Sequence, residues 1–297
     1  MYINKIIDSR TFHEASKLLR DFFEKKGYVE VATQSRLSIL SACEDPSTIA
    51  TFQYSGKVWP LKQTGQMDLE YELLTNPGYP GVFCQSTSYR QEANPIPGRH
   101  DLIFPMFEFE AKGDMDDLIA LESEFLESLG FPMEKHDNPE LYEHLGINGH
   151  KEYVKVNYNE LAGYWGVNEI TANEEERIWK EVSPVLFLKN FPEHTSPFWN
   201  MKRNTEAGTS NKVDVILYGI ETIGSAEREN DPNEMLRRFH SISNGKYAEL
   251  LYSHFGRGRV MRELGEFLDL EMAPRFGGGI GMTRMIRALA LAKKMNN

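Results

Sequence analysis

Apolar residues recur at helical spacing in two long stretches of the chain. Between residues 10 and 26 they fall near one face of a helix, and Gly27 predicts where that helix ends. From Asp114 to Leu129 a second stripe predicts another amphipathic helix, with Asp116 and Asp117 near its start, where the helix dipole favours acidic side chains. Further helices are expected at 233–242, at 246–268 around Gly256 and Gly258, and through Leu291 after a glycine-rich turn.

Alternating apolar and polar residues predict strands between these helices. Residues 82–92 and 102–110 form two such runs, and the intervening prolines and glycine force the chain to turn. In the second run, the aromatic residues Phe107 and Phe109 face one way and Glu108 and Glu110 the other. Shorter strands are expected at 28–31, from residue 184, and at 214–225 around a turn at Tyr218–Gly219. The pattern therefore predicts helices and strands in one chain.

Composition limits the classes of protein that fit these elements. The 297 residues are 40% hydrophobic and 26% charged, which is ordinary for a soluble globular chain. No apolar run approaches the roughly 20 residues of a membrane span, and the N-terminus lacks the apolar core of a signal peptide. Cys43 and Cys84 are too few for a disulfide framework. We therefore expect a cytoplasmic protein that does not contact a membrane.

The net charge weakens the expectation of a nucleic-acid partner. The chain carries −11 with a pI near 5.3, so it has no broad basic surface of the kind that binds phosphate backbones.

The turn between the two long strands concentrates groups that suit a nucleotide. Arg90 and Glu92 are two apart and share a face of the predicted strand, Arg99 and His100 lie in the turn, and Phe104 lies on the returning strand. Guanidinium groups grip phosphate, a carboxylate accepts from an exocyclic amine, and an aromatic ring stacks on a base. The alternative is a solvated hairpin whose arginines pair with its glutamates.

The order of these residues resembles motif 2 of the class II aminoacyl-tRNA synthetases that handle aspartate, asparagine and lysine. This resemblance implies that Arg90, Glu92, Arg99, His100 and Phe104 bind ATP, with Arg90 acting on the reacting phosphate. It also implies an α+β fold, an antiparallel sheet flanked by helices, and carboxylate activation by ATP with release of pyrophosphate.

Three other segments extend the resemblance to an amino-acid pocket. Glu44 matches the glutamate of a loop that closes over the amino acid, and Gln66 matches a glutamine that accepts from its ammonium group. Arg228 matches an arginine for the side-chain oxygen, and Glu229 follows it as in asparaginyl-type members. Leu69 stands where aspartate-using members carry a lysine, which is evidence against a plain aspartyl pocket.

The C-terminal third supplies an expected metal pair and a last phosphate ligand. Asp214 and Glu221 lie on adjacent predicted strands, and two carboxylates near a triphosphate suit Mg²⁺ because hard cations take oxygen ligands. Gly277–Arg284 resembles motif 3, which implies that Arg284 is catalytic and binds ATP together with Glu221. The helix and strand before residue 31 resemble motif 1, which implies a homodimer.

The resemblance leads to one main expectation and two alternatives. We expect residues 1–297 to form a single catalytic domain with no room for an anticodon-binding domain, which needs on the order of 100 residues. The main expectation is an ATP-dependent, AMP-forming ligase like the archaeal asparagine synthetase, joining aspartate to ammonia or another small amine, with tRNA an unlikely partner. The alternatives are a stand-alone asparaginyl-type core that acts on tRNA or a carrier, and a non-catalytic regulatory paralogue.

Overall fold

The computed structural model describes residues 7–42, 46–96, 101–147 and 152–295. The chain divides into two compact units. Unit 1 comprises residues 1–112, 198–200 and 228–283, and unit 2 comprises residues 113–197, 201–227 and 284–297.

Unit 1 is built on strands that pair in the order β1-β4-β5-β11. Their bounds are β1 (Val29–Glu30), β4 (Gly81–Tyr89), β5 (Ile103–Lys112) and β11 (Arg275–Gly281). The β1–β4 pair is parallel, and the β4–β5 and β5–β11 pairs are antiparallel. The predicted hairpin is therefore confirmed, but its first strand ends at Tyr89 rather than at Glu92.

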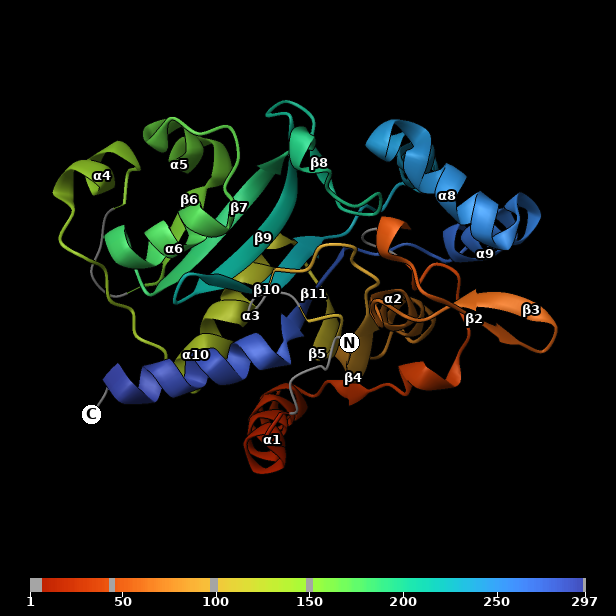
Figure 1. The fold of residues 1–297 in the computed structure, drawn as a ribbon, viewed down its shortest axis with the longest axis horizontal. Coiled ribbons are helices and arrows are strands. Elements are labelled where there is room, and N and C mark those ends of the chain that lie inside the picture. Colours follow the sequence, from red (N-terminus) through yellow and green to blue (C-terminus); the bar gives the residue numbers. More distant parts are fainter. Residues whose placement is uncertain (1–6, 43–45, 97–100, 148–151, 296–297) are drawn as a thin grey trace. The chain divides into compact units, whose positions relative to one another are not determined.

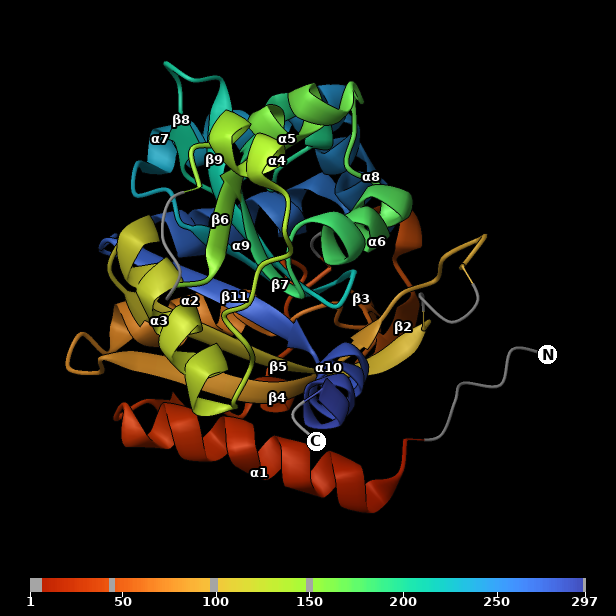
Figure 2. The same ribbon diagram turned by 90° about the vertical axis from the view of Figure 1, so that its left-hand side faces the viewer.

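One face of these strands is covered by α1 (Ser9–Lys25), as Figure 2 shows. The ring of Phe23 stacks on Phe107 and Phe109, with centroid separations of 5.3 and 5.2 Å. Aromatic stacking of this kind adds to the free energy gained by burying the rings. Gly27 follows the helix with φ +80°, the left-handed conformation that glycine adopts at a helix end. The predicted helix and the predicted direction of the phenylalanines are confirmed.

The helix α2 (Gln66–Thr75) also packs on β4, where buried Leu69 and Leu73 meet Val82 and Cys84. The rest of unit 1 is a β-hairpin and a set of helices. Asp231 caps α7 (Pro232–Ser241), because its Oδ1 accepts from the amide of Asn233 at 2.9 Å. These elements are η1 (Thr33–Ser35), η2 (Pro46–Thr48), β2 (Thr51–Tyr54), β3 (Lys57–Pro60), α7 (Pro232–Ser241), η4 (Ile242–Gly245), α8 (Lys246–Phe255) and α9 (Arg257–Leu268).

The glycine run before the last helix is a strand, not the turn that the sequence predicted. Gly277 to Gly281 belong to β11, where Gly277 pairs with Glu110 and Gly279 with Glu108. A Cβ on Gly277 would overlap the carboxylate of Glu110. The glycine is therefore required because β11 passes directly over a buried side chain.

Unit 2 contains strands that pair in the order β10-β9-β7-β6, with β8 beside β9 (Figure 1). Their bounds are β6 (Val154–Asn157), β7 (Val185–Pro192), β8 (Arg203–Asn204), β9 (Thr209–Leu217) and β10 (Ile220–Glu227). Only the β6–β7 pair among them is parallel within the described residues. The β9–β10 turn falls at Tyr218 and Gly219, which have φ of 49° and 78°, as a tight hairpin requires.

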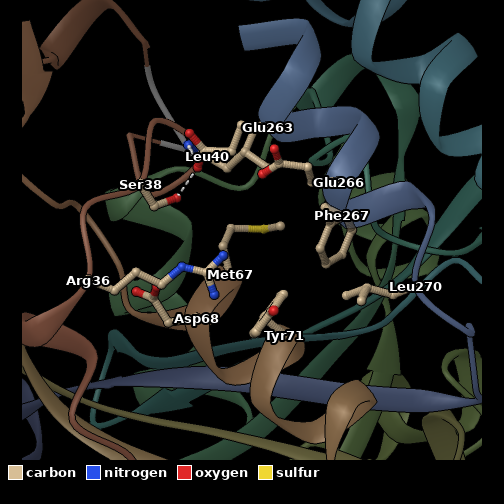
Figure 3. A pocket seen from close by; sticks show the side chains of 10 residues that line it. All are labelled: Arg36, Ser38, Leu40, Met67, Asp68, Tyr71, Glu263, Glu266, Phe267 and Leu270. Atoms are coloured by element: carbon tan, nitrogen blue, oxygen red, sulfur yellow. Dashed lines mark hydrogen bonds and ion pairs between the residues drawn. The ribbon is translucent and has the colours of Figure 1, made fainter. Parts of the chain in front are cut away.

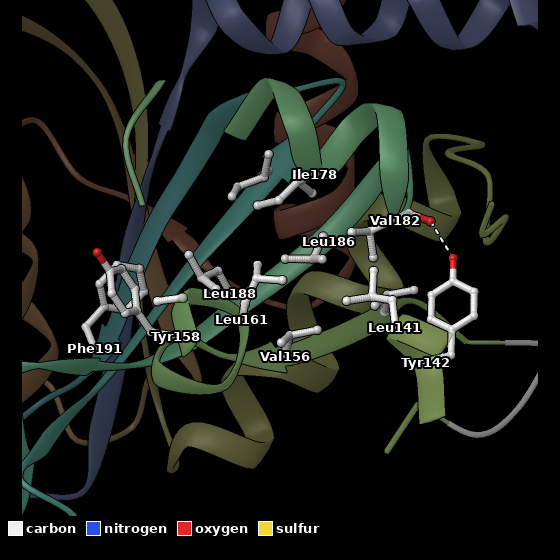
Figure 4. Packing of buried hydrophobic residues seen from close by; sticks show 13 residues of the cluster. Leu141, Tyr142, Val156, Tyr158, Leu161, Ile178, Val182, Leu186, Leu188 and Phe191 are labelled. Carbon is white, nitrogen blue, oxygen red and sulfur yellow. Dashed lines mark hydrogen bonds between the residues drawn. The ribbon is translucent and has the colours of Figure 1, made fainter. Parts of the chain in front are cut away.

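The helices of unit 2 are α3 (Met115–Ser128), α4 (Pro139–His144), α5 (Tyr158–Trp165), α6 (Ala172–Glu181) and α10 (Met282–Met295) from Arg284 onward, with the short turn η3 (Glu193–Thr195). Figure 4 shows the core that α4, α5 and α6 form with β6 and β7, where Leu141, Leu161 and Ile178 are fully buried. The predicted helix at 114–129 is confirmed as α3, and Asp114 and Asp117 close a capping box at its start.

Both units combine mainly antiparallel strands with helices, so the α+β class is confirmed. Within the described ranges, no helix is long and apolar enough to cross a bilayer.

Candidate functional site

The predicted site residues are distributed over both units. Unit 1 holds Gln66, Arg90, Glu92, Phe104, Arg228 and Glu229, and unit 2 holds Asp214, Glu221 and Arg284. Glu44, Arg99 and His100 lie outside the described residues.

Arg228 is the centre of the group in unit 1. Its side chain is 2% exposed and forms a two-point ion pair with Glu110 on β5. Nε donates to Oε1 at 2.9 Å and Nη2 donates to Oε2 at 3.0 Å. This geometry fixes the plane of the guanidinium, as two parallel charge-assisted hydrogen bonds do.

A second buried ion pair lies beside the first. Arg275 on β11 donates from Nε and Nη2 to Oε2 of Glu70 on α2, at 2.9 and 2.7 Å. The other oxygen of Glu70 accepts from Nδ2 of Asn200 at 2.5 Å and lies 3.8 Å from Nε of Arg228. We call Glu70, Glu110, Arg228 and Arg275 the arginine–glutamate lattice.

The lattice is electrically balanced but costly to bury. Burial raises the pKa of Glu110 to about 7, which the guanidinium of Arg228 opposes and the neighbouring Glu70 reinforces. Two buried ions stay charged only when their mutual attraction offsets the loss of water. The two-point contact with Arg228 favours the charged form of Glu110, so removing either partner leaves an uncompensated buried charge.

The lattice also holds Gln66, the first residue of α2. With its carboxamide oriented to match the surrounding donors, the Gln66 oxygen accepts from Nη2 of Arg228 at 2.6 Å and from the amide of Gly278 at 3.3 Å. Gln66 and Arg228, both expected to bind the amino acid, are therefore in direct contact.

Glu108 fixes the start of the same helix through hydrogen bonds from the two residues before it. Its carboxylate is 1% exposed and accepts from the amide of Gly65 at 2.8 Å and from the hydroxyls of Thr64 and Ser86. Gly65 is the N-cap of α2, so this anchor sets the position of Gln66.

Sequence reasoning gave no role to Glu70, Glu108, Glu110, Asn200 or Arg275. The alternation of Glu108 and Glu110 with Phe107 and Phe109 could have indicated a role for these glutamates, since it placed them on the face opposite the aromatic core. Arg275 had no comparable signal, because its partners come from distant parts of the chain.

Arg90 and Phe104 lie on facing ends of the β4–β5 hairpin. The amide of Arg90 donates to the carbonyl of Leu102 at 2.8 Å, and its guanidinium carbon lies 5.6 Å from the centroid of the Phe104 ring. Glu92 is half-buried but follows the end of β4, so the two-residue alternation that paired it with Arg90 does not apply there.

Glu229 has a local structural contact in unit 1. Its Oε1 accepts from the amides of Asn230 and Asp231 at 2.9 and 3.2 Å, just before α7. Its own amide donates to the carbonyl of Asn200 at 2.7 Å.

In unit 2, Asp214 and Glu221 project toward one point above Gly224. The register pairs Gly224 with Asp214, and an irregularity between Glu221 and Ile223 shifts the strand. A Cβ on Gly224 would lie 2.9 Å from Oε1 of Glu221 and 3.6 Å from Oδ1 of Asp214. The predicted pairing of these two carboxylates across the β9–β10 hairpin is thus present in the structure.

Negative charge exceeds positive charge around this pair, because Glu175, whose Oε2 accepts from the amide of Glu221 at 2.8 Å, adds a third carboxylate to a group that has the cations Lys212 and Arg284. Asp214 is 7% exposed, and Nζ of Lys212 lies 2.8 Å from its Oδ2. Burial raises the pKa of Asp214 to about 7; Lys212 opposes the shift, and Glu221 adds to it. The site therefore favours an additional positive charge.

Arg284, in the first turn of α10, contacts the same strand. Its Nη1 donates to the carbonyl of Glu221 at 2.7 Å and lies 3.7 Å from the Oε2 of that residue. The side chain is 31% exposed, so the guanidinium is held by the strand and still reaches solvent.

The carboxylate oxygens of Asp214 and Glu221 suit a divalent cation. Oδ1 of Asp214 is buried without a hydrogen-bond partner among the described residues, and carboxylate oxygens are the ligands that Mg²⁺ takes. No cluster of three or more potential ligand side chains occurs in the described ranges, so the chain would supply only part of the coordination shell. Mg²⁺ commonly binds through one or two carboxylates together with substrate phosphates.

Residues 4–297 match the family model of class II tRNA synthetases of the D, K and N group. The chain belongs to this family. Its members are ATP-dependent ligases, which agrees with an enzyme that activates a carboxylate.

Relatives with known names cover most of this chain. It is 26% identical over 299 residues to an aspartate–tRNA(Asp) ligase of Pyrobaculum aerophilum, covering 94% of this chain and 63% of that protein. It is 26% identical over 255 residues to an asparagine–tRNA ligase of Azobacteroides pseudotrichonymphae, covering 76% of this chain and 51% of the relative. The chain thus spans between half and two thirds of the length of these relatives.

The fold agrees with solved synthetases. The asparaginyl-tRNA synthetase of Pyrococcus horikoshii, in complex with asparaginyl-adenylate, superposes with a TM-score of 0.71 at 22% identity, covering 94% of this chain and 64% of that one. An aspartyl-type synthetase of Leishmania major gives a TM-score of 0.68 at 18% identity, covering 95% and 62%.

These comparisons correct the main functional expectation. The relatives and the family model are tRNA ligases for aspartate, asparagine and lysine, so the assignment as an asparagine synthetase is wrong. The expectation that tRNA is an unlikely partner likewise has no support. It rested on net charge and on the expectation that the chain has no room for an anticodon-binding domain, and neither excludes a local tRNA-binding surface.

Proposed function

We propose that the chain activates an amino acid of the aspartate and asparagine class with ATP and transfers it to tRNA or to a carrier that presents a similar acceptor. A carboxylate oxygen of the amino acid attacks the α-phosphorus of ATP, the bond to the β-phosphate oxygen breaks, and pyrophosphate leaves. An acceptor hydroxyl or amine then attacks the carbonyl carbon of the adenylate, and AMP leaves. The observation that carries the proposal is the grouping of Asp214, Glu221 and Arg284 in unit 2.

That grouping suits a nucleotide triphosphate. Arg284 is held by Glu221 yet reaches solvent, so it can offset charge on a phosphate without a large rearrangement. Asp214 and Glu221 would hold Mg²⁺, which when bound would supply positive charge to the phosphate oxygens. Because these charges are already positioned in the protein, they stabilise the transition state at low reorganisation cost.

Arg90, Glu92 and Phe104 in unit 1 complete our assignment of nucleotide binding. The separation of 5.6 Å between the Arg90 guanidinium and the Phe104 ring supports it, since an arginine and an aromatic ring together can contact phosphate and base.

The amino-acid side chain is assigned to the lattice of unit 1. Arg228 already faces the carboxylate of Glu110, so a substrate carboxylate would add negative charge to a balanced group, while an amide would not. Leu69 is buried in the core and offers no second cation. We therefore propose that asparagine is activated in preference to aspartate.

Pyrophosphate exchange tests the first step. Purified protein is incubated with ATP, Mg²⁺, labelled pyrophosphate and each amino acid in turn. Exchange with asparagine, with aspartate weaker, is the expected result. Exchange that responds best to a large apolar or a basic amino acid would overturn the pocket assignment.

Transfer is tested separately with labelled asparagine and total tRNA. Label that becomes acid-precipitable and ribonuclease-sensitive identifies tRNA as the acceptor. Exchange without such label, together with label on a protein fraction, identifies a carrier. Failure of exchange in all conditions would leave the regulatory alternative as the better account.

We also propose a homodimer. In support, α1 and β1 leave Leu18 and Val29 exposed by 44% and 37%, an apolar surface that a second copy could cover. Sedimentation equilibrium tests this: a single monomeric species across the micromolar range would contradict it.

A further inference from the structure

Unit 1 contains a cavity of about 240 Å³ that the proposed reaction does not use. Its walls come from α2, α9 and the segment around residues 36–40 (Figure 3). On α2 the cavity is lined by Met67, Asp68 and Tyr71. On the same helix, Gln66 contacts the arginine–glutamate lattice and Glu70 belongs to it. Since drug-sized ligands occupy pockets of roughly 300–1,000 Å³, this cavity suits a smaller molecule.

Part of the lining is apolar. Met67 and Phe267 contribute side chains that are 5% and 4% exposed, and Leu40 and Leu270 add aliphatic surface. A ligand with a short hydrocarbon side chain would bury that chain here and gain the free energy of removing it from water.

One guanidinium on the rim is available to a ligand. Arg36 lies with its guanidinium carbon 4.0 Å from the centroid of the Tyr71 ring. Its nearest carboxylate is Asp68, at 3.9 Å, and Asp68 is already paired with Lys62 at 2.5 Å. The Arg36 side chain is 42% exposed, so its donors can reach a carboxylate that enters the cavity.

One carboxylate is available on the other side. Glu263 of α9 is occupied, because it accepts from the hydroxyl of Ser38 at 2.5 Å and from the amide of Ile39 at 2.9 Å. Glu266, three residues along the helix, is exposed and has no hydrogen bond or ion pair to the described part of the chain. Figure 3 shows Arg36 and Glu266 on opposite sides of the hollow, with Met67 between them.

We propose that this cavity binds a small zwitterion with an apolar side chain, in chemical terms a free aliphatic amino acid. Its carboxylate meets Arg36, its ammonium meets Glu266, and its side chain lies against Met67 and Phe267. An anion such as a nucleotide would face the nearby carboxylates. A simple amine would leave the guanidinium without a partner. Only a ligand carrying both charges pairs both available groups.

Calorimetry on the full chain tests the proposal with L-leucine as the probe. Two analogues each lack one charge: isoamylamine has no carboxylate and isocaproate has no ammonium. We expect leucine to bind in the micromolar to millimolar range and each analogue to bind about tenfold or more weakly, because each loses one charged contact. Equal or tighter binding of either analogue would overturn the two-charge assignment.

Substitutions then locate the site. Arg36→Gln and Glu266→Gln should each weaken leucine binding by about tenfold, since each removes one charge from an exposed side chain. Glu249→Gln, at an exposed position of α8, is the matched control and should leave it unchanged. Gln66→Ala separates this cavity from the candidate activation site, and leucine binding should survive it.

Three results would reject the proposal. They are no heat from leucine at millimolar concentration, leucine binding that is unaffected by both charge substitutions, and leucine binding that disappears with Gln66→Ala. Thermal unfolding of every variant verifies that lost binding is not lost folding. None of these outcomes depends on pyrophosphate exchange, so the cavity and the proposed reaction can fail independently.

Discussion

The two groups of charged residues differ in how their charges are balanced. In unit 1, Glu70 and Glu110 each face an arginine, and the lattice they form with Arg228 and Arg275 is almost completely buried. In unit 2, Asp214 and Glu221 face each other across a glycine, with Lys212 on one oxygen and Arg284 farther away. A balanced group can position a neutral or zwitterionic molecule, whereas an undercompensated one favours a cation. The difference therefore supports the two roles that we propose, amino-acid binding in unit 1 and binding of a metal ion and phosphate in unit 2.

The largest expected effect comes from breaking the balanced group. Arg228→Leu should destabilise the protein by about 3–5 kcal/mol, because it leaves Glu110 buried without its cation. Exchange should disappear with it. Chemical denaturation measures the first effect, and pyrophosphate exchange the second.

The double substitution Arg228→Leu with Glu110→Leu sharpens this result. Replacing both partners of a buried ion pair by apolar side chains is often neutral or stabilising. We expect stability to recover and exchange to stay absent, which separates the role of Arg228 in folding from its role with the substrate. Recovery of exchange in the double variant would show that Arg228 does not contact the amino acid.

The undercompensated group should respond in the opposite way. Arg284→Ala should lower exchange by about 10²–10³-fold, equivalent to about 3–4 kcal/mol of transition-state stabilisation, with little change in stability because the side chain is partly exposed. Arg90→Ala should behave similarly. Exchange kinetics at saturating ATP measure the loss, and Arg237→Ala, a change at an exposed arginine of α7, is the control.

A smaller effect is expected from pH. The raised pKa of Asp214, about 7, means that the residue is largely protonated at pH 6 and ionised at pH 8. Binding of Mg²⁺ needs the ionised form, so its affinity in the presence of ATP should rise about tenfold between these values. Asp214→Asn should flatten the profile. A profile that is already flat in the natural protein would show that Asp214 is not a ligand.

The last expected effect is on stability alone and concerns Glu122, a fully buried carboxyl on α3. Burial raises its pKa to about 8, so the folded state binds its proton more tightly than the unfolded chain does. Stability should therefore fall as pH rises from about 4.5 to 8, by at most roughly 1.4 kcal/mol per pH unit. Glu122→Gln should reduce this dependence, measured by thermal unfolding from pH 5 to 9. An unchanged slope would contradict the assignment.

Much of the local structure follows from the sequence alone. The 3.6-residue spacing of apolar side chains located α1 and α3. Gly27 marked the end of α1, because glycine readily adopts the left-handed conformation that commonly follows a helix. The alternation in β5 separated its phenylalanines from its glutamates, since side chains of a strand point to opposite faces. Asp214 and Glu221 could be paired because a hairpin is a local structure.

The contacts within the arginine–glutamate lattice were decided only by tertiary structure. Glu70 and Arg275 are separated by 205 positions, and Glu110 and Arg228 by 118, so no spacing rule relates them. In the sequence, the glycines of β11 resembled a turn. In the structure they form a strand, and glycine is required at Gly277 because a Cβ there would overlap the carboxylate of Glu110. A local pattern determines which way a side chain points, but the partner it meets depends on how distant segments pack.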